Sequence, residues 1–201
     1  MKARLGGKKV AILVTNGFEQ VELTSPRQAL EKAGASTEII SPAGTTVKAW
    51  DETKWGKTFK VDVSLKRAKA EDYDALLLPG GVMNPDKLRL EEAAIDFVRA
   101  FFDESKPVAA ICHGPWTLIN AGVVKGRRLT SYPSIQADLE NAGADWVDER
   151  VVVDNGLVTS RKPADLPAFN RKMIEEIAEG IHEQPARSLY AEPAMAASGV
   201  D

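Results

Sequence analysis

Short apolar runs alternate with amphipathic stretches along most of this chain. Continuous apolar residues predict strands covered on both faces at KVAILV (9–14), within YDALLLPGG (73–81) and at Val108–Ile111. The segment STEIIS (36–41) predicts a further strand, which ends at the turn signal SPAG. Because helical patterns separate these strands, the chain is expected to form a mostly parallel sheet with helices on both faces.

Three stretches have the spacing of helices. Residues 18–34 become helical towards a C-cap at Gly34, and the stretches 91–105 and 165–180 each carry an apolar stripe. The stripes consist of Ala94, Phe97, Val98 and Phe101 in the first stretch and of Leu166, Phe169, Met173 and Ile177 in the second. The helices are expected to pack on the sheet through these residues.

Two other stretches predict hairpins. Residues 45–65, which hold two tryptophans among Thr, Lys and Asp, predict a loop or small hairpin that covers the body of the protein. The triplet DNG (154–156) lies between two β-rich runs and predicts a tight turn. No internal repeat is visible, so a single α/β domain is expected over 8–182. A short polar lead-in precedes it at 1–7, and a mobile tail of small residues is expected at 183–201.

Composition and charge narrow the class of protein. The chain has 201 residues, of which 44% are hydrophobic and 27% charged, as in ordinary globular proteins. Its 26 basic and 29 acidic residues give a net charge of −3, which offers no attraction for nucleic acid or for an anionic membrane. The single cysteine cannot form an intrachain disulfide, and no apolar run is long enough for a membrane span or a signal-peptide core. A cytoplasmic protein is expected.

The segment KPVAAICHGPW (106–116) holds that cysteine. Val108–Ile111 is followed closely by a Gly-Pro pair, and proline suits the first turn of a helix, so Cys112 is placed on a tight corner between a strand and a helix. A nucleophile elbow uses this geometry, and the dipole and free N–H groups of the following helix favour a thiolate. The alternative is a small residue buried beside a turn. We expect Cys112 to be a nucleophile.

Further candidates follow the other strands, because sites in parallel α/β sheets form beyond the carboxyl ends of the strands. His113 is either a proton-transfer group or a turn-stabilising side chain, since the side chains of consecutive residues at a corner usually diverge. Glu19 and Glu22 either complement a helix dipole or reach Cys112 as a proton donor or base. A glutamate near a second negative charge is more easily kept protonated.

The glycine pair that ends the third strand is a candidate of another kind. Gly80 and Gly81 have unscreened N–H groups, which form either a plain turn or an oxyanion hole. The chain contains neither a P-loop motif nor a dinucleotide fingerprint, and a lone thiol with two scattered histidines lacks zinc-site spacing. Neither a metal nor a nucleotide cofactor is expected.

Together these motifs resemble the PfpI family of intracellular cysteine hydrolases, which includes general stress proteins. The resemblance extends from about residue 8 to residue 180 and is carried by GFEQVELTSPRQAL, ALLLPGG, AAICHGPW, LTSYPSI and AGADWVDERVVVDNGLVTSRKPADLPAF. It implies a flavodoxin-like three-layer sandwich. The implied superfamily is the class I glutamine amidotransferase-like one, which also contains the Parkinson-disease-linked deglycase.

The resemblance also implies roles for individual residues. Cys112 matches the nucleophile, Glu22 matches the acid that hydrogen-bonds its sulfur, and His113 matches the family's Cys-His pair. A second acid, the oxyanion-hole turn and a pocket tyrosine are matched by Glu19, Gly80, Gly81 and Tyr132.

One match is imperfect. Proteolytic members of the family complete a triad with an acid from a neighbouring subunit, and the nearest match here is Asp86 in VMNPDKLRL. The segment is one residue longer than expected, and Asp replaces Glu. Both departures argue against peptidase activity.

These features lead to three hypotheses about function. The first is a stress-protective, cofactor-independent cysteine hydrolase that acts on reactive carbonyls or glycation adducts, as a glyoxalase or deglycase does. The second is an intracellular cysteine peptidase, and the third is a non-enzymatic redox sensor or chaperone. The expected partners are a small carbonyl or peptide substrate and a second copy of the chain, in a homodimer or a higher oligomer.

Overall fold

The computed structural model describes residues 4–182, so the tail predicted at 183–201 lies outside the described residues. The strands are β1 (Lys9–Leu13), β2 (Ser36–Ser41), β3 (Thr46–Asp51), β4 (Lys54–Lys60), β5 (Val63–Ser64), β6 (Ala75–Leu78), β7 (Val108–Ile111), β8 (Arg128–Leu129), β9 (Asp145–Trp146), β10 (Val151–Asp154) and β11 (Leu157–Ser160). The helices are α1 (Gln20–Lys32), α2 (Met83–Leu88), α3 (Glu92–Asp103), α4 (Pro115–Asn120), α5 (Gln136–Asn141) and α6 (Leu166–Glu179).

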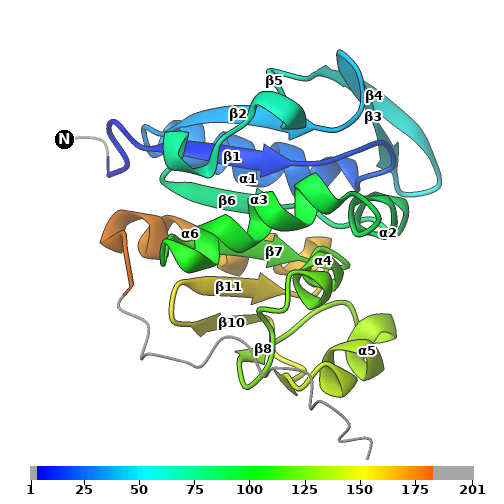
Figure 1. The fold of residues 1–201 in the computed structure, drawn as a ribbon, viewed down its shortest axis with the longest axis vertical. Coiled ribbons are helices and arrows are strands. Elements are labelled where there is room, and N and C mark those ends of the chain that lie inside the picture. Colours follow the sequence, from blue (N-terminus) through cyan, green and yellow to red (C-terminus); the bar gives the residue numbers. More distant parts are fainter. Residues whose placement is uncertain (1–3, 183–201) are drawn as a thin grey trace, which may run out of the picture.

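The centre of the molecule is a seven-stranded sheet in the order β10-β11-β7-β6-β1-β2-β5 (Figure 1). Every neighbouring pair is parallel except β10 and β11, which form an antiparallel hairpin at one edge. The mostly parallel sheet predicted from the alternation of strands and helices is therefore confirmed. Since parallel strands end at the same edge, the segments that follow β1, β6 and β7 are brought together.

Both faces of the sheet are buried, as the continuous apolar runs predict. Successive residues of β1 point to opposite faces: Ala11 and Leu13 pack in the cluster formed with α3, while Val10 and Ile12 pack in the cluster formed with α1 and α6. Figure 1 shows α3 in front of the sheet and α1 and α6 behind it. All eight residues predicted to form the two helical stripes are buried. The result is a three-layer α/β sandwich.

The two predicted hairpins are both present. β3 and β4 pair antiparallel, and their tryptophans Trp50 and Trp55 meet edge to face with ring centroids 5.5 Å apart. The turn between β10 and β11 places Asn155 at φ 46° and Gly156 at φ 78°. Positive φ at both central residues defines the type I′ turn that Asn-Gly favours.

The segment expected to be only a polar lead-in contributes to the core. Leu5 is fully buried, and its N–H donates to the carbonyl oxygen of Ala33 at the end of α1 over 2.8 Å. The domain therefore begins earlier than residue 8. Within residues 4–182, none of the helices has the length and apolar character needed to cross a membrane.

Candidate active site

Cys112 occupies a strained corner between β7 and α4. Its φ is 62°, in the left-handed region that non-glycine residues rarely adopt, at a cost of about 1–3 kcal/mol. Hydrogen bonds on both sides hold the corner: the N–H of Cys112 donates to the Ser160 carbonyl (2.9 Å), and its own carbonyl accepts from the N–H of Tyr132 (2.8 Å). The tight strand-to-helix corner predicted from the Gly-Pro pair is present, and its strain is of the kind found at nucleophile elbows.

The segments after β1, β6 and β7 meet at this corner, as the parallel topology requires. Glu22 is fully buried in the first turns of α1, and one of its oxygens, Oε2, accepts a hydrogen bond from the N–H of Gly80 over 2.9 Å. A Cβ atom added at Gly80 would lie 2.7 Å from both Cys112 Cβ and Glu22 Oε2. The close approach of these three residues therefore requires glycine at position 80.

The carboxyl of Glu22 is held in a setting that favours its protonated form. Burial raises the pKa of Glu22 to about 8, an effect that the hydrogen bonds from Cys112 and Gly80 only partly offset. Its second oxygen, Oε1, is buried and has no hydrogen-bond partner among residues 4–182. An ionised carboxylate with an unpartnered buried oxygen is costly. At neutral pH Glu22 is therefore mostly protonated and able to donate a hydrogen bond.

The thiol of Cys112 does not have the lowered pKa expected from a helix N-terminus. Burial raises the pKa of Cys112, and a negative charge on Glu22 raises it further, while the N–H groups of Gly81 and His113 act in the opposite direction. Cys112 is only 7% exposed. The dipole of α4 is small, because this helix has just six residues. The Cys112–Glu22 pair thus carries at most one negative charge near neutral pH.

This electrostatic setting predicts a specific pH dependence of stability. The pKa of Glu22 rises from 4.5 to about 8 on folding, so between these values the unfolded chain holds fewer protons and the free energy of unfolding falls as pH rises. The variant Glu22→Gln has no proton to lose. We expect the difference in unfolding free energy between Glu22→Gln and the wild type to change across this window by up to roughly 5 kcal/mol.

Denaturant unfolding at a series of pH values measures this difference. Glu31→Gln, which removes an exposed carboxyl from the same helix, is the control and is expected to run parallel to the wild type. A Glu22→Gln curve that also ran parallel to the wild type would show that Glu22 does not resist ionisation in the folded state.

The side chains of Cys112 and His113 converge, although consecutive residues at a corner were expected to diverge. Cys112 Sγ lies 3.2 Å from His113 Nδ1, and the other ring nitrogen, Nε2, lies 2.9 Å from Ser134 Oγ. The ring stacks on Tyr132 at a centroid distance of 4.7 Å. Burial lowers the pKa of His113, so the ring is neutral at pH 7. With a proton on Nε2 directed to Ser134, Nδ1 presents a lone pair to the thiol.

The structure changes the part expected of the glycine pair. Because the N–H of Gly80 already donates to Glu22, it is not free to hold an oxyanion. The backbone N–H groups that lower the pKa of the Cys112 thiol, and so favour a negative charge there, are those of Gly81 and His113. An anion formed next to Cys112 would therefore meet Gly81 and His113 rather than the two glycines.

A cavity of about 450 Å³ opens over the thiol. Glu19 and Tyr132 line it as expected, together with Trp50 from the β3–β4 hairpin and Met83 from α2. Glu19 Oε1 accepts a hydrogen bond from the N–H of Glu52 over 3.4 Å, and burial raises the pKa of Glu19.

Three residues differ from what the sequence predicts for the site: Asp86, Ser134 and Trp50. Asp86 lies exposed on α2 and is not among the residues that line the cavity, so a single chain does not bring it to His113. Ser134, which fixes the histidine ring, was missed because a serine after SYP carries no signal of its own. The sequence also gives no sign that Trp50 lines the cavity, since this depends on how β3 and β4 fold over the sheet.

Comparison with known proteins finds close relatives over most of the chain. The model of the DJ-1/PfpI family matches residues 8–176. General stress protein 18 of Bacillus subtilis is 47% identical over 170 residues, which cover 84% of this chain and 96% of that protein. A second protein of the same organism, named "Putative cysteine protease YraA", is 47% identical over 168 residues, which cover 83% of this chain and 96% of the relative.

A solved structure shows the same fold. The crystal structure of Drosophila melanogaster DJ-1beta superposes with a TM-score of 0.77 at 31% sequence identity, and the match covers 85% of this chain and 90% of the other. The flavodoxin-like α/β architecture expected from the sequence is confirmed by this likeness and by the sheet order.

Proposed function

Because the chain belongs to the DJ-1/PfpI family, we propose that it is a cofactor-independent cysteine enzyme that attacks reactive carbonyl compounds through Cys112. The strongest support comes from the groups that surround the sulfur of Cys112. The thiol projects from a strained corner, lies 3.2 Å from a neutral histidine nitrogen and faces a carboxyl that is protonated at neutral pH. A base for the thiol and a donor for the carbonyl are thus both within the site.

The proposed reaction on methylglyoxal begins with addition to the aldehyde. Sγ of Cys112 forms a bond to the aldehyde carbon while Nδ1 of His113 takes the thiol proton, and the carbonyl oxygen becomes an oxyanion next to the N–H groups of Gly81 and His113. Proton transfer to that oxygen, from Glu22 or from the protonated His113, completes a hemithioacetal.

The remaining steps need no external oxidant or reductant. A base in the site, Glu22 or His113, removes the proton from the former aldehyde carbon, and a proton returns to the neighbouring carbon. The proton of the hydroxyl group moves to the oxygen of that neighbouring carbon, which leaves a carbonyl next to the sulfur. This internal transfer converts the hemithioacetal into a thioester of lactate. Attack by water then breaks the carbon–sulfur bond, so lactate leaves and the Cys112 thiol is restored. The neutral His113 is suited to both proton acceptance and return.

The test is the formation of lactate from methylglyoxal by the purified protein. We expect steady turnover, abolished when the single cysteine has first been blocked with iodoacetamide. Blocked protein is the matched control, because it has the same sequence and differs only at the sulfur. A lactate rate no greater than that of the blocked protein would overturn the proposal.

A peptidase is the second candidate, and the name of the relative "Putative cysteine protease YraA" favours it. In this chain Oγ of Ser134 is hydrogen-bonded to Nε2 of His113, the ring nitrogen that the acid of a catalytic triad would contact. Asp86 is exposed on α2. Peptide hydrolysis would therefore require Asp86 from a second copy of the chain. Hydrolysis of casein by an oligomer, lost in Asp86→Asn, would favour the peptidase. Lactate formation without casein hydrolysis would favour the carbonyl enzyme.

A further inference from the structure

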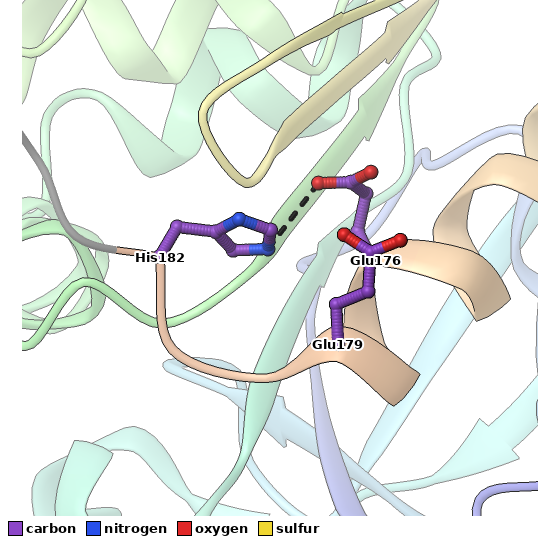
Figure 2. Close-up of side chains that lie close together, drawn as sticks. All are labelled: Glu176, Glu179 and His182. Atoms are coloured by element: carbon purple, nitrogen blue, oxygen red, sulfur yellow. Dashed lines mark ion pairs between the residues drawn. The ribbon is translucent and has the colours of Figure 1, made fainter.

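A second group of ionisable side chains lies at the end of α6. Glu176 and Glu179 are in its last turn, and His182 follows the helix. One ligand-type atom from each of the three lies within 4.8 Å of those of the other two. Figure 2 shows the imidazole ring facing the carboxyl of Glu176, with Glu179 beside it. These three residues are called the α6-end cluster below.

The α6-end cluster is remote from the thiol. The N–H of His182 donates to the carbonyl of Ser105 over 3.1 Å, and Ser105 precedes β7. Cys112 follows the opposite end of the same strand. In Figure 1 the end of α6 accordingly lies at the edge away from α2 and the β3–β4 hairpin, which lie over the carboxyl ends of the strands. Whatever the cluster binds does not reach the reaction centre.

Two atoms in the cluster face each other without a hydrogen bond. His182 Nε2 lies 3.2 Å from Glu176 Oε2, an ion-pair contact when the ring is protonated (dashed line in Figure 2), and it has no hydrogen-bond partner within the part of the chain that the structure describes. Glu176 is itself only 8% exposed. When the ring carries its proton on the other nitrogen, the lone pair of Nε2 and the carboxylate oxygen face the same point, which is the arrangement that a metal ion bridges.

The C-terminal end of α6 also favours a positive charge at the cluster. The C-terminus of a helix carries partial negative charge and normally attracts Lys, Arg or protonated His. The last turn of α6 has no basic residue and instead holds the two carboxylates of the cluster. Lys172, one turn earlier, is engaged by Glu175 at 2.7 Å. The cluster therefore combines two carboxylates with a negative helix end and an imidazole nitrogen that faces one of them.

We propose that Glu176, Glu179 and His182 form a binding site for a divalent metal ion, and that Zn²⁺ is the ion it takes. One imidazole nitrogen with two carboxylate oxygens is a ligand set that suits zinc, whereas Mg²⁺ and Ca²⁺ prefer oxygen alone. Zinc bonds of about 2.0–2.1 Å in tetrahedral geometry place neighbouring ligand atoms about 3.3 Å apart. The 3.2 Å between Nε2 and Oε2 fits this spacing.

The third ligand can adjust to complete the site. Glu179 is exposed, so its carboxyl can rotate towards the other two atoms, and water would fill the fourth position. His182 is the fixed member, because its ring packs on Gly156, where a Cβ would come within 2.8 Å of the ring. A bound ion would therefore tie the end of α6 to the β10–β11 turn and to the loop before β7. Its role is structural and is independent of the proposed carbonyl chemistry.

Calorimetric titration of the metal-free full-length chain with ZnCl₂ tests the proposal. The titration uses Cys112→Ala, which removes the only thiol and with it the competing soft ligand. We expect one zinc ion per chain, an affinity lowered at least about 10-fold in Glu179→Gln, and loss of the site in His182→Gln. Glu175→Gln is the matched control: it removes a neighbouring carboxyl on the same helix and is expected to bind zinc normally.

A second readout does not depend on heats of binding. At a zinc concentration about 100 times Kd, the Tm is expected to rise by roughly 5–10 °C in the Cys112→Ala protein and to stay unchanged in His182→Gln made in the same background. Circular dichroism of His182→Gln checks that the variant is folded. Absence of one-to-one binding would overturn the site and leave a protonated His182–Glu176 ion pair. Equal binding by His182→Gln would overturn it as well, by placing the zinc elsewhere.

Discussion

Replacing Cys112 with serine is expected to lower the rate of lactate formation from methylglyoxal by about 10³-fold or more. Every step of the proposed reaction passes through a bond to this sulfur, and a serine hydroxyl is a much weaker nucleophile at neutral pH. His113 Nδ1, 3.2 Å away, is a neutral base too weak to ionise an alcohol without further activation. The loss should appear in kcat rather than in KM, because the cavity that receives the substrate is unchanged.

The fold is expected to survive this change. Serine is close in size to cysteine, and its hydroxyl can donate to His113 and accept from the N–H groups of Gly81 and His113. The unfolding free energy should stay within about 1 kcal/mol of the wild type. Kinetics and denaturant unfolding of the same preparation measure both quantities. A folded Cys112→Ser protein that keeps more than about a tenth of the wild-type rate would remove Cys112 from the mechanism.

Replacing Gly114 with alanine is expected to lower the free energy of unfolding by about 3 kcal/mol or more. A Cβ at this position would lie 2.4 Å from the carbonyl oxygen of Leu78 and 2.9 Å from that of Ile111. Both neighbours are backbone atoms at the ends of buried central strands, so neither can move aside cheaply. The corner that presents Cys112 would have to open, and activity should fall together with stability.

Gly44→Ala is the matched control for this prediction. It makes the same chemical change at a glycine where nothing lies within 4 Å of the added Cβ and the backbone is not left-handed. Its effect should stay within about 0.5 kcal/mol. Thermal unfolding is sufficient for the comparison, because 3 kcal/mol corresponds to a fall in Tm of roughly 6–12 °C for a domain of this size. Equal Tm values for the two variants would show that the corner tolerates a side chain.

The sequence predicts the fold well because the signals for it are local. Continuous apolar runs at β1, β6 and β7 can be buried only between two layers of helices, and the Asn-Gly turn specifies its own hairpin. The place of the site follows from the same logic, since parallel strands deliver Glu22, Gly80 and Cys112 to one edge. Leu5 shows the limit of the approach, because a single leucine in a polar segment does not indicate that it packs against α1.

The chemistry of the site was harder to predict because it depends on three-dimensional contacts. The helix dipole favours a thiolate at Cys112, but burial beside Glu22 outweighs a helix of six residues, and no sequence pattern reports that balance. The N–H of Gly80 is taken by a glutamate 58 residues away in the sequence. The ring of His113 turns back towards the sulfur because Ser134 and Tyr132 hold it there.

The central claim is that Cys112 is an accessible nucleophile whose ionisation is coupled to Glu22. The rate of its alkylation by iodoacetamide in the folded protein, followed by intact mass from about pH 5 to pH 10, tests this most directly. Each added group is assigned to Cys112, because the chain has one cysteine.

Complete labelling of the folded protein is expected, with a rate that rises through an inflection above the ordinary pKa of a cysteine, because burial and the negative charge on Glu22 raise the pKa of the Cys112 thiol. The inflection should move to lower pH in Glu22→Gln, which removes that charge, and remain in place in Glu31→Gln. Labelling no faster than global unfolding, or the same inflection in both variants, would contradict the account and identify Cys112 as a buried structural residue.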